Sequence, residues 1–201
     1  MSKKFNYLAK RYECHEGTKK VFTDPISKLD FYGGGKFKDL VIHRNHLIIS
    51  LLGSSPSDSI RWSCVNSASE KLDKYKLSVI EIDWSDGDAL NFKKDFWIDL
   101  LSVIRTEKKD VTIYCLGGHG RTGTALSILA SMCGVTDKDP VQYIRDKYCN
   151  KVVETQSQID YIEEITDKVV SCKPKHIFYE GIYGHFGIQK KDNDTPKGFV
   201  Y

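Results

Sequence analysis

A cysteine and an arginine six positions apart, joined by a glycine-rich turn, are the residues of this chain best suited to chemistry. The stretch CLGGHGRTG places Cys115 and Arg121 at the ends of the turn, with Gly117, Gly118 and Gly120 between them. Glycines let the main chain curl closely around a ligand, including at positive φ. A thiolate is a nucleophile, and a guanidinium group can bind two phosphate oxygens at once. We therefore interpret the turn as a phosphoryl-binding loop in which the cysteine attacks phosphorus.

The segments on either side of the turn support this interpretation. Residues 111–114 are mostly β-branched and predict a buried strand, and residues 122–133 predict a helix with one apolar face. The N–H groups of the turn and the N-terminus of that helix then converge on one point, which suits an anion. The predicted substrate-binding residues are those of the loop itself: Leu116, Gly117, Gly118, His119, Gly120 and Arg121.

Two polar residues of the loop have alternative roles. The hydroxyl of Thr122 can donate to the sulfur of Cys115 and stabilise it as a leaving group, or it can bond main chain at the start of the helix. His119 can supply an additional donor that reads a second phosphate, or it can be a partly exposed turn residue.

The loop resembles the Cys-x-x-Gly-x-Gly-Arg-Thr-Gly signature of the cysteine-based protein tyrosine phosphatase superfamily. From about residue 46 to residue 170, the arrangement is similar to the compact dual-specificity branch. The resemblance implies hydrolysis through a phosphocysteine intermediate, with no metal and no cofactor. Two positions depart from the pattern. Tyr114 replaces a histidine that helps to tune the thiol, and His119 stands where many members carry an apolar residue and several phosphoinositide phosphatases carry lysine.

The same resemblance implies a general acid, an aspartate on a mobile loop that precedes the cysteine. The stretch IDWSDGDAL offers Asp83, Asp86 and Asp88. Its Trp-Ser-Asp resembles the Trp-Pro-Asp of the tyrosine-specific branch and ends at Asp86, 29 positions before Cys115. We predict Asp86 as the acid, with the other two as alternatives. Asp88 is also well placed to cap a helix that begins at Ala89.

A second element implied by the resemblance is a glutamine-containing loop that positions the hydrolytic water. The stretch ETQSQ is similar to it. Gln158 matches the better-shared glutamine, while Glu154 replaces another.

Strands and helices alternate along the chain and predict an α/β fold, with a central, mainly parallel, twisted sheet flanked by helices. We expect a helix that begins at Pro140 with Asp139 as N-cap, and a last helix with an isoleucine face.

The turn-rich residues 22–40 predict an irregular entry to the domain or a short hairpin. Their Gly-Gly-Gly lacks the Lys-Ser/Thr of a nucleotide-binding loop. The remaining expected elements are strands at 46–53 and 77–84 and helices at 67–76 and 89–105.

Length and composition predict one catalytic domain. The chain has 201 residues, of which 40% are hydrophobic. We expect the domain at residues 46–172, an N-terminal extension at 1–45 that packs on it or leads into it, and an aromatic and glycine-rich extension at 173–201. The net charge of +3 is too small for a strongly basic nucleic-acid binder. Residues 1–20, with six Lys/Arg against two Glu, predict a solvated basic arm or a docking segment.

Targeting signals and cysteine usage favour a cytoplasmic protein. No apolar run has the length of a membrane span, and no signal-peptide core follows the first residue. The six cysteines are irregularly spaced and predict reduced thiols.

The partner predicted first is a phosphorylated protein, with phosphotyrosine and also phosphoserine or phosphothreonine as substrates. A phosphoinositide or an RNA 5′-phosphate is the alternative, because the same signature serves them and a fold does not decide a substrate. A third hypothesis is a catalytically weak phosphate-binding pseudophosphatase.

Overall fold

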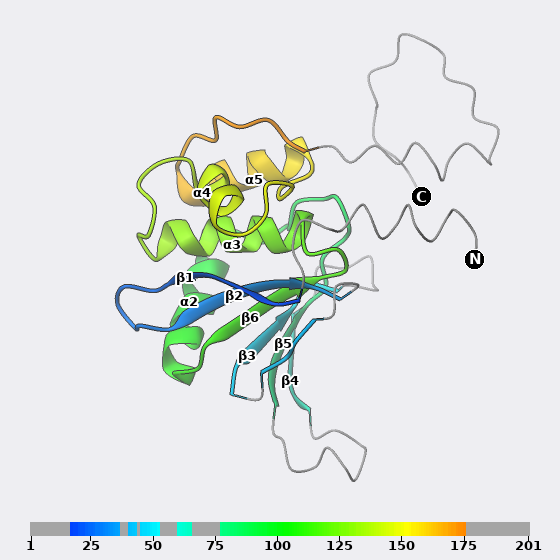
Figure 1. The fold of residues 1–201 in the computed structure, drawn as a ribbon, viewed down its shortest axis with the longest axis vertical. Helices are drawn as coiled ribbons and strands as arrows, with labels where there is room; N and C mark the ends of the chain where they lie inside the picture. Colours follow the sequence, from blue (N-terminus) through cyan, green and yellow to red (C-terminus); the bar gives the residue numbers. More distant parts are fainter. Residues whose placement is uncertain (1–16, 37–39, 44, 53–59, 66–76, 176–201) are drawn as a thin grey trace, which may run out of the picture.

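The computed structural model describes residues 17–36, 40–43, 45–52, 60–65 and 77–175 (Figure 1). In chain order the described elements are β1 (Lys19–Thr23), β2 (Asp30–Gly35), β3 (Leu47–Ser50), β4 (Ile60–Val65), β5 (Leu77–Ile82), α2 (Lys94–Glu107), β6 (Val111–Cys115), α3 (Gly120–Met132), α4 (Pro140–Lys147) and α5 (Gln156–Thr166). Among the described helices, none is both long and apolar enough to cross a membrane.

The strands form one sheet in the order β1-β2-β6-β3-β5-β4. The four inner strands are parallel, and each outer strand is antiparallel to its neighbour. Strand β6 lies inside the sheet and is buried along most of its length, as expected for a parallel strand covered on both faces. Its register pairs Cys115 with Gly35 of β2 and Tyr114 with Ser50 of β3. Because parallel strands end at the same edge, the loops that follow β5 and β6 lie at one edge of the sheet.

Helix α3 is the central helix of the domain. It contacts β6 and β2 on one side and α4 and α5 on the other, so that Figure 1 shows three layers: the sheet, α3, and the α4–α5 pair. Residues 120–130 are all buried, which explains why the helix has no extended polar face. A small residue allows one close approach, since a Cβ at Gly123 would lie 2.4 Å from the Cβ of Val152.

The mainly parallel α/β sheet flanked by helices confirms the predicted fold class. Helix α4 also begins as its sequence indicates, because the side chain of Asp139 accepts hydrogen bonds from the N–H groups of Val141 and Gln142, and Pro140 occupies the first turn. Helix α5 begins with a capping box between Thr155 and Gln158, which we did not predict.

Several predicted boundaries need correction. The strands expected at 46–53 and 77–84 are shorter, since β3 and β5 end before the loops at the edge of the sheet. The helix expected at 89–105 is α2 at Lys94–Glu107, and Asp88 does not cap it. Asp88 lies five positions before the N-cap Lys93, too far to bond the first turn, and its carbonyl accepts the indole N–H of Trp84 at 2.9 Å. The helix expected at 67–76 lies outside the described residues.

The segment before residue 46 contributes to the sheet itself. The β1–β2 pair is the short hairpin that we gave as one alternative, and β2 pairs with β6 along its whole length. The predicted domain limits thus leave out two strands that complete the edge next to β6. Most of the basic arm at 1–20 and of the extension at 173–201 lies outside the described residues.

Candidate active site

The loop between β6 and α3 holds Cys115 at its base. The cysteine side chain is buried, at 2% exposure, and its Sγ accepts a hydrogen bond from the N–H of Gly118 at 3.2 Å. Gly118 has φ +76°, a conformation that favours glycine over other residues. The chain therefore folds back on itself, so that a main-chain N–H dipole faces the sulfur.

The triple glycine of β2 lies directly beside this loop. A Cβ at Gly35 would lie 2.7 Å from the carbonyl carbon of Gly117 and 2.8 Å from the nitrogen of Gly118. No side chain fits between β2 and the loop at this position. The glycines at 33–35 therefore support the loop through close packing rather than by cradling a phosphate, and this support is a signal that our sequence analysis missed.

Arg121 lies at the first turn of α3, where its side chain is 5% exposed. Its Nη1 donates to the carbonyl of Trp84 at 2.9 Å, and its Nη2 lies 3.0 Å from Oδ1 of Asp86. Its Nε is buried and has no hydrogen-bond partner among the described residues. A buried donor without a partner is costly, and such groups in native structures often lie where a ligand binds. The guanidinium group thus reaches the loop after β5 and keeps one N–H available to an anion.

The three candidate acids occupy different environments. Asp86 pairs with Arg121 while its own side chain is 57% exposed, so it lies at the mouth of the site. Asp83 is buried at the end of β5, with a residue exposure of 9%. Asp88 is exposed. Among these three aspartates, Asp86 is the one for which the structure describes an ion pair with Arg121.

The loop that carries Asp86 is attached to the start of α5. The hydroxyl of Thr155 donates to the carbonyl of Gly87 at 2.7 Å, and the hydroxyl of Ser157 donates to the same carbonyl at 3.3 Å. Gly87 itself has φ +81°, which makes a tight turn after Asp86. Sequence analysis missed this attachment, since the two segments are 68 residues apart.

Gln158 and Glu154 lie next to the phosphate loop. A Cβ at Gly120 would approach Oε2 of Glu154 to 2.6 Å and Nε2 of Gln158 to 2.9 Å. The Oε1 of Gln158 accepts the N–H of Glu154 at 2.8 Å, which fixes the amide group. Its Nε2 is buried and lacks a hydrogen-bond partner among the described residues. A second unpartnered N–H donor therefore lies beside the loop.

Thr122, His119 and Tyr114 have distinct surroundings. The hydroxyl of Thr122 donates to the carbonyl of Gly34 at 3.4 Å, which matches the main-chain alternative in this structure. His119 is only 2% exposed, so the alternative of a partly exposed turn residue is wrong: the ring is packed inside the domain at the start of α3. Tyr114 is half-buried in β6.

The other described thiols have different environments. Cys115, Cys133, Cys149 and Cys172 are all free. Burial, together with the neighbouring Asp24, raises the pKa of Cys133 to about 12. Burial also raises the pKa of Cys172. These two thiols stay protonated near neutral pH, and neither has a glycine-rich turn around it.

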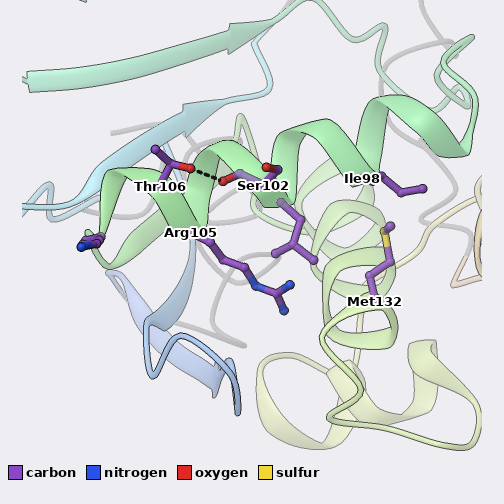
Figure 2. Close-up of a pocket in the computed structure, with 7 residues that line it drawn as sticks. Ile98, Ser102, Arg105, Thr106 and Met132 are labelled. Carbon is purple, nitrogen blue, oxygen red and sulfur yellow. Dashed lines mark hydrogen bonds between the residues drawn. The ribbon is translucent and has the colours of Figure 1, made fainter.

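A surface groove of about 720 Å³ lies between α2 and the end of α3, and Figure 2 shows its lining. Ile98 and Arg105 line it from α2, and Met132 lines it from α3. Helix α3 starts at the phosphate loop and has 13 residues, so about 18 Å of helix separates the groove from the loop. The groove is therefore distinct from the candidate active site.

Comparisons with known proteins match parts of this chain. A family model described as "Swiss Army Knife protein, DSP-PTPase phosphatase domain" matches residues 89–175, a segment that holds the phosphate loop and Gln158 but begins after Asp86. An uncharacterized protein of Methanocaldococcus jannaschii is 39% identical over 70 residues, which is 35% of this chain and 43% of the relative. A second uncharacterized protein of the same organism is 38% identical over 74 residues, which is 37% of this chain and 49% of the relative. Each match thus spans less than half of the relative's length.

Two solved structures are similar in fold. A glycine-to-alanine mutant form of Tk-PTP has a TM-score of 0.50 at 18% identity, covering 74% of this chain and 95% of that one. The active form of Tk-PTP has a TM-score of 0.47 at 18% identity, covering 70% and 92%.

Proposed function

Because residues 89–175 match the model of a DSP-PTPase phosphatase domain, we propose that the chain is a dual-specificity-like member of the cysteine-based protein tyrosine phosphatase superfamily and that it hydrolyses phosphomonoesters through a phosphocysteine at Cys115. The match supports phosphatase activity in general. We propose, in addition, which residues catalyse each step and which class of substrate is hydrolysed.

The observation that carries the proposal is the set of N–H donors in and beside the loop between β6 and α3. The N–H of Gly118 points at Cys115, while Nε of Arg121 and Nε2 of Gln158 are buried donors without partners among the described residues. A phosphoryl group bound to the sulfur would bring oxygen acceptors to this region. Preorganised donors of this kind stabilise the charge that develops in a phosphoryl-transfer transition state.

In the first step the thiolate of Cys115 attacks phosphorus and the bond from phosphorus to the ester oxygen breaks. Arg121 binds two phosphoryl oxygens, which requires it to release Asp86. A general acid must carry a proton, so this step uses the protonated form of Asp86. Asp86 then donates its proton to the leaving oxygen, and the phosphoryl group remains on the sulfur.

In the second step water attacks the phosphocysteine. The carboxylate of Asp86 accepts a proton from the water, the bond from phosphorus to sulfur breaks, and inorganic phosphate and the Cys115 thiolate are released. We assign to Gln158 the role of orienting the water, and its unpartnered Nε2 beside Gly120 supports this role. The proposed mechanism uses no metal, because Arg121 and the loop N–H groups stabilise the negative charge of the phosphoryl group.

We propose a phosphorylated protein as the substrate, with phosphotyrosine first and phosphoserine or phosphothreonine as further substrates. Phosphoinositides and RNA 5′-phosphates are the alternative within the same chemistry. A panel of phosphopeptides, inositol phosphates and 5′-triphosphorylated RNA ranks these classes by kcat/KM.

The nucleophile is tested with 4-nitrophenyl phosphate and a serine variant. Cys115→Ser should lose more than about 10²-fold in kcat, because an alkoxide is far harder to form than a thiolate, while phosphate binding should remain. Cys172→Ser is the matched control, since it makes the same substitution away from the loop, and it should keep the wild-type rate. Adding a chelator should leave wild-type turnover unchanged, and vanadate should inhibit it.

Two results would contradict the proposal. Retained turnover in Cys115→Ser would remove the phosphocysteine. Phosphate binding by the wild-type protein without any turnover would favour the pseudophosphatase hypothesis instead.

A further inference from the structure

Tyr148, which follows α4 and lies outside the signature, reaches the phosphate loop. Its side chain is buried, at 2% exposure, and its hydroxyl donates to the carbonyl of Gly118 at 3.0 Å. Gly118 is the same residue whose N–H points at Cys115. A tyrosine 30 positions downstream is therefore bonded to the turn that faces the sulfur.

The tyrosine ring has a site built for it. A Cβ at Gly33 of β2 would lie 2.9 Å from two ring atoms of Tyr148 and 2.9 Å from a methyl group of Leu126 in α3. The ring thus fills the space that glycine leaves between the sheet and α3. Its main chain is anchored as well, because the Tyr148 N–H donates to the carbonyl of Ile144 at 2.8 Å. The hydroxyl is consequently presented from a rigid part of the domain.

This hydrogen bond orients a peptide unit of the loop. A peptide bond is planar and trans, so the N–H of His119 points away from the side on which the Gly118 carbonyl meets Tyr148. Gly118, which precedes this unit, has no side chain to restrict its rotation. If the Gly118 carbonyl turned toward the bound anion, it would repel the anion. The hydrogen bond from the buried Tyr148 hydroxyl keeps this carbonyl on the other side and satisfies it there.

We propose that Tyr148 is a positioning residue that holds the Gly118–His119 peptide in the orientation that binds the phosphoryl group. Gly33 has the complementary role of making room for the ring. The role assigned to Tyr148 rests on the proposed function, since it acts on the loop that would bind the substrate. It touches neither the phosphoryl group nor the reacting atoms.

The test uses the full chain, inorganic phosphate and 4-nitrophenyl phosphate. Tyr148→Phe keeps the ring and removes the hydroxyl. A hydrogen bond of ordinary net strength corresponds to a change of about tenfold. We expect the dissociation constant for phosphate and the KM for 4-nitrophenyl phosphate to rise by about that factor. The kcat should change less, because the loop donors bind phosphoryl oxygens in the ground state as well as in the transition state.

Tyr143→Phe is the matched control, because it removes a hydroxyl from the same helix at a half-buried position and should leave both constants unchanged. Gly33→Ala is a second route to the same effect. It crowds the ring while leaving the hydroxyl in place, so it should also weaken phosphate binding. Urea unfolding of each variant separates a change in the loop from a general loss of stability.

The results separate the two proposals. A phosphate affinity within twofold of wild type in Tyr148→Phe overturns the positioning role, whether or not stability falls, and leaves the hydrolase proposal standing. A wild-type protein that binds phosphate without turnover, and whose Tyr148→Phe variant binds about tenfold more weakly, contradicts the hydrolase proposal and supports the positioning role. A wild-type protein that neither binds nor hydrolyses phosphate contradicts both.

Discussion

Two arginine–aspartate pairs lie in different parts of this domain, and they are built in opposite ways. One is Arg121 with Asp86 at the phosphate loop, and the other is Arg105 with Asp24 between α2 and the β1–β2 turn. In the first pair the arginine is buried, at 5% exposure, and the aspartate is 57% exposed. In the second pair the aspartate is fully buried and the arginine is 29% exposed.

The Arg105–Asp24 pair has a fully satisfied carboxylate. Two guanidinium nitrogens of Arg105 donate to it at 2.8 and 3.1 Å, and the Ser27 hydroxyl and the N–H groups of Ile26 and Ser27 complete its bonding. Burial by itself would raise the pKa of Asp24. The hydrogen bonds from Arg105, Ser27 and Ile26 outweigh burial and hold that pKa well below its usual range. This pair is an internal connection of the fold.

The Arg121–Asp86 pair keeps bonding capacity on the arginine and solvent access on the aspartate. Arg121 has an Nε without a partner among the described residues, and its carboxylate partner can be displaced into water at little cost. The comparison teaches that all hydrogen-bonding positions of the carboxylate are used in a pair that stabilises the fold. In a pair suited to binding an anion, one N–H group of the arginine has no partner within the described residues.

The largest expected effects come from replacing each arginine with lysine. Arg121→Lys should lower kcat/KM by about 10³-fold, because one point charge replaces a fork of N–H donors, with little change in the unfolding midpoint. Arg105→Lys is its matched counterpart. It should leave kcat/KM within about twofold and lower the free energy of unfolding by about 1 kcal/mol. Equal losses of kcat/KM in the two variants would contradict the conclusion that one pair serves catalysis and the other serves stability.

The next effect concerns the exposed partner of the loop arginine. Asp86→Asn should lower kcat/KM for phosphotyrosine by about 10²-fold and flatten the falling limb of the pH profile, since asparagine cannot donate the proton. The loss should be much smaller with 4-nitrophenyl phosphate, whose leaving group needs little protonation. Asp88→Asn is the control and should behave as wild type. If Asp83→Asn alone flattens the limb, the acid is Asp83.

A third expectation tests the buried partner of Arg105. Asp24→Asn should lower the free energy of unfolding by about 2 kcal/mol at pH 7, since it removes charge-assisted hydrogen bonds. The folded-state pKa of Asp24 is depressed, so its stabilising contribution is fully present above the unfolded-state pKa of about 3.9 and is lost progressively as the pH falls from there through the folded-state pKa. The difference between the urea midpoints of wild type and variant should therefore be constant from pH 6 to about pH 5 and narrow as the pH is lowered to 2.5. A difference that stays constant down to pH 2.5 would contradict the assignment.

The smallest effect is expected at the attachment of the Asp86 loop. Thr155→Val removes the hydroxyl that donates to the carbonyl of Gly87, so the acid should be less well held. We expect a loss of about fivefold in kcat/KM for phosphotyrosine, less than the full effect of one hydrogen bond, because the Ser157 hydroxyl donates to the same carbonyl. Thr155→Ser keeps a hydroxyl and should restore the rate. A serine variant as slow as the valine variant would show that the methyl group matters rather than the hydrogen bond.

The elements that could be predicted are those whose signals are local. Asp139 and Pro140 start α4 as expected, because a cap acts within one turn of its own helix. The start of α2 was predicted wrongly, since the helix begins at Lys94 rather than at Ala89. The Asp88 carbonyl, near the expected start, accepts the indole N–H of Trp84 from the segment after β5, and no helical periodicity reveals this bond.

The sequence by itself determined the loop between β6 and α3 that we propose to bind phosphate, since a strand, a glycine-rich turn and a helix are continuous in the chain and Cys115 and Arg121 are six positions apart. The tertiary structure decided which groups meet that loop. Asp86 faces Arg121 because β5 and β6 run parallel and end at one edge of the sheet. Tyr148 reaches Gly118 because Gly33 leaves space between β2 and α3. These contacts join segments tens of residues apart, so they depend on strand register and packing, which no local spacing encodes.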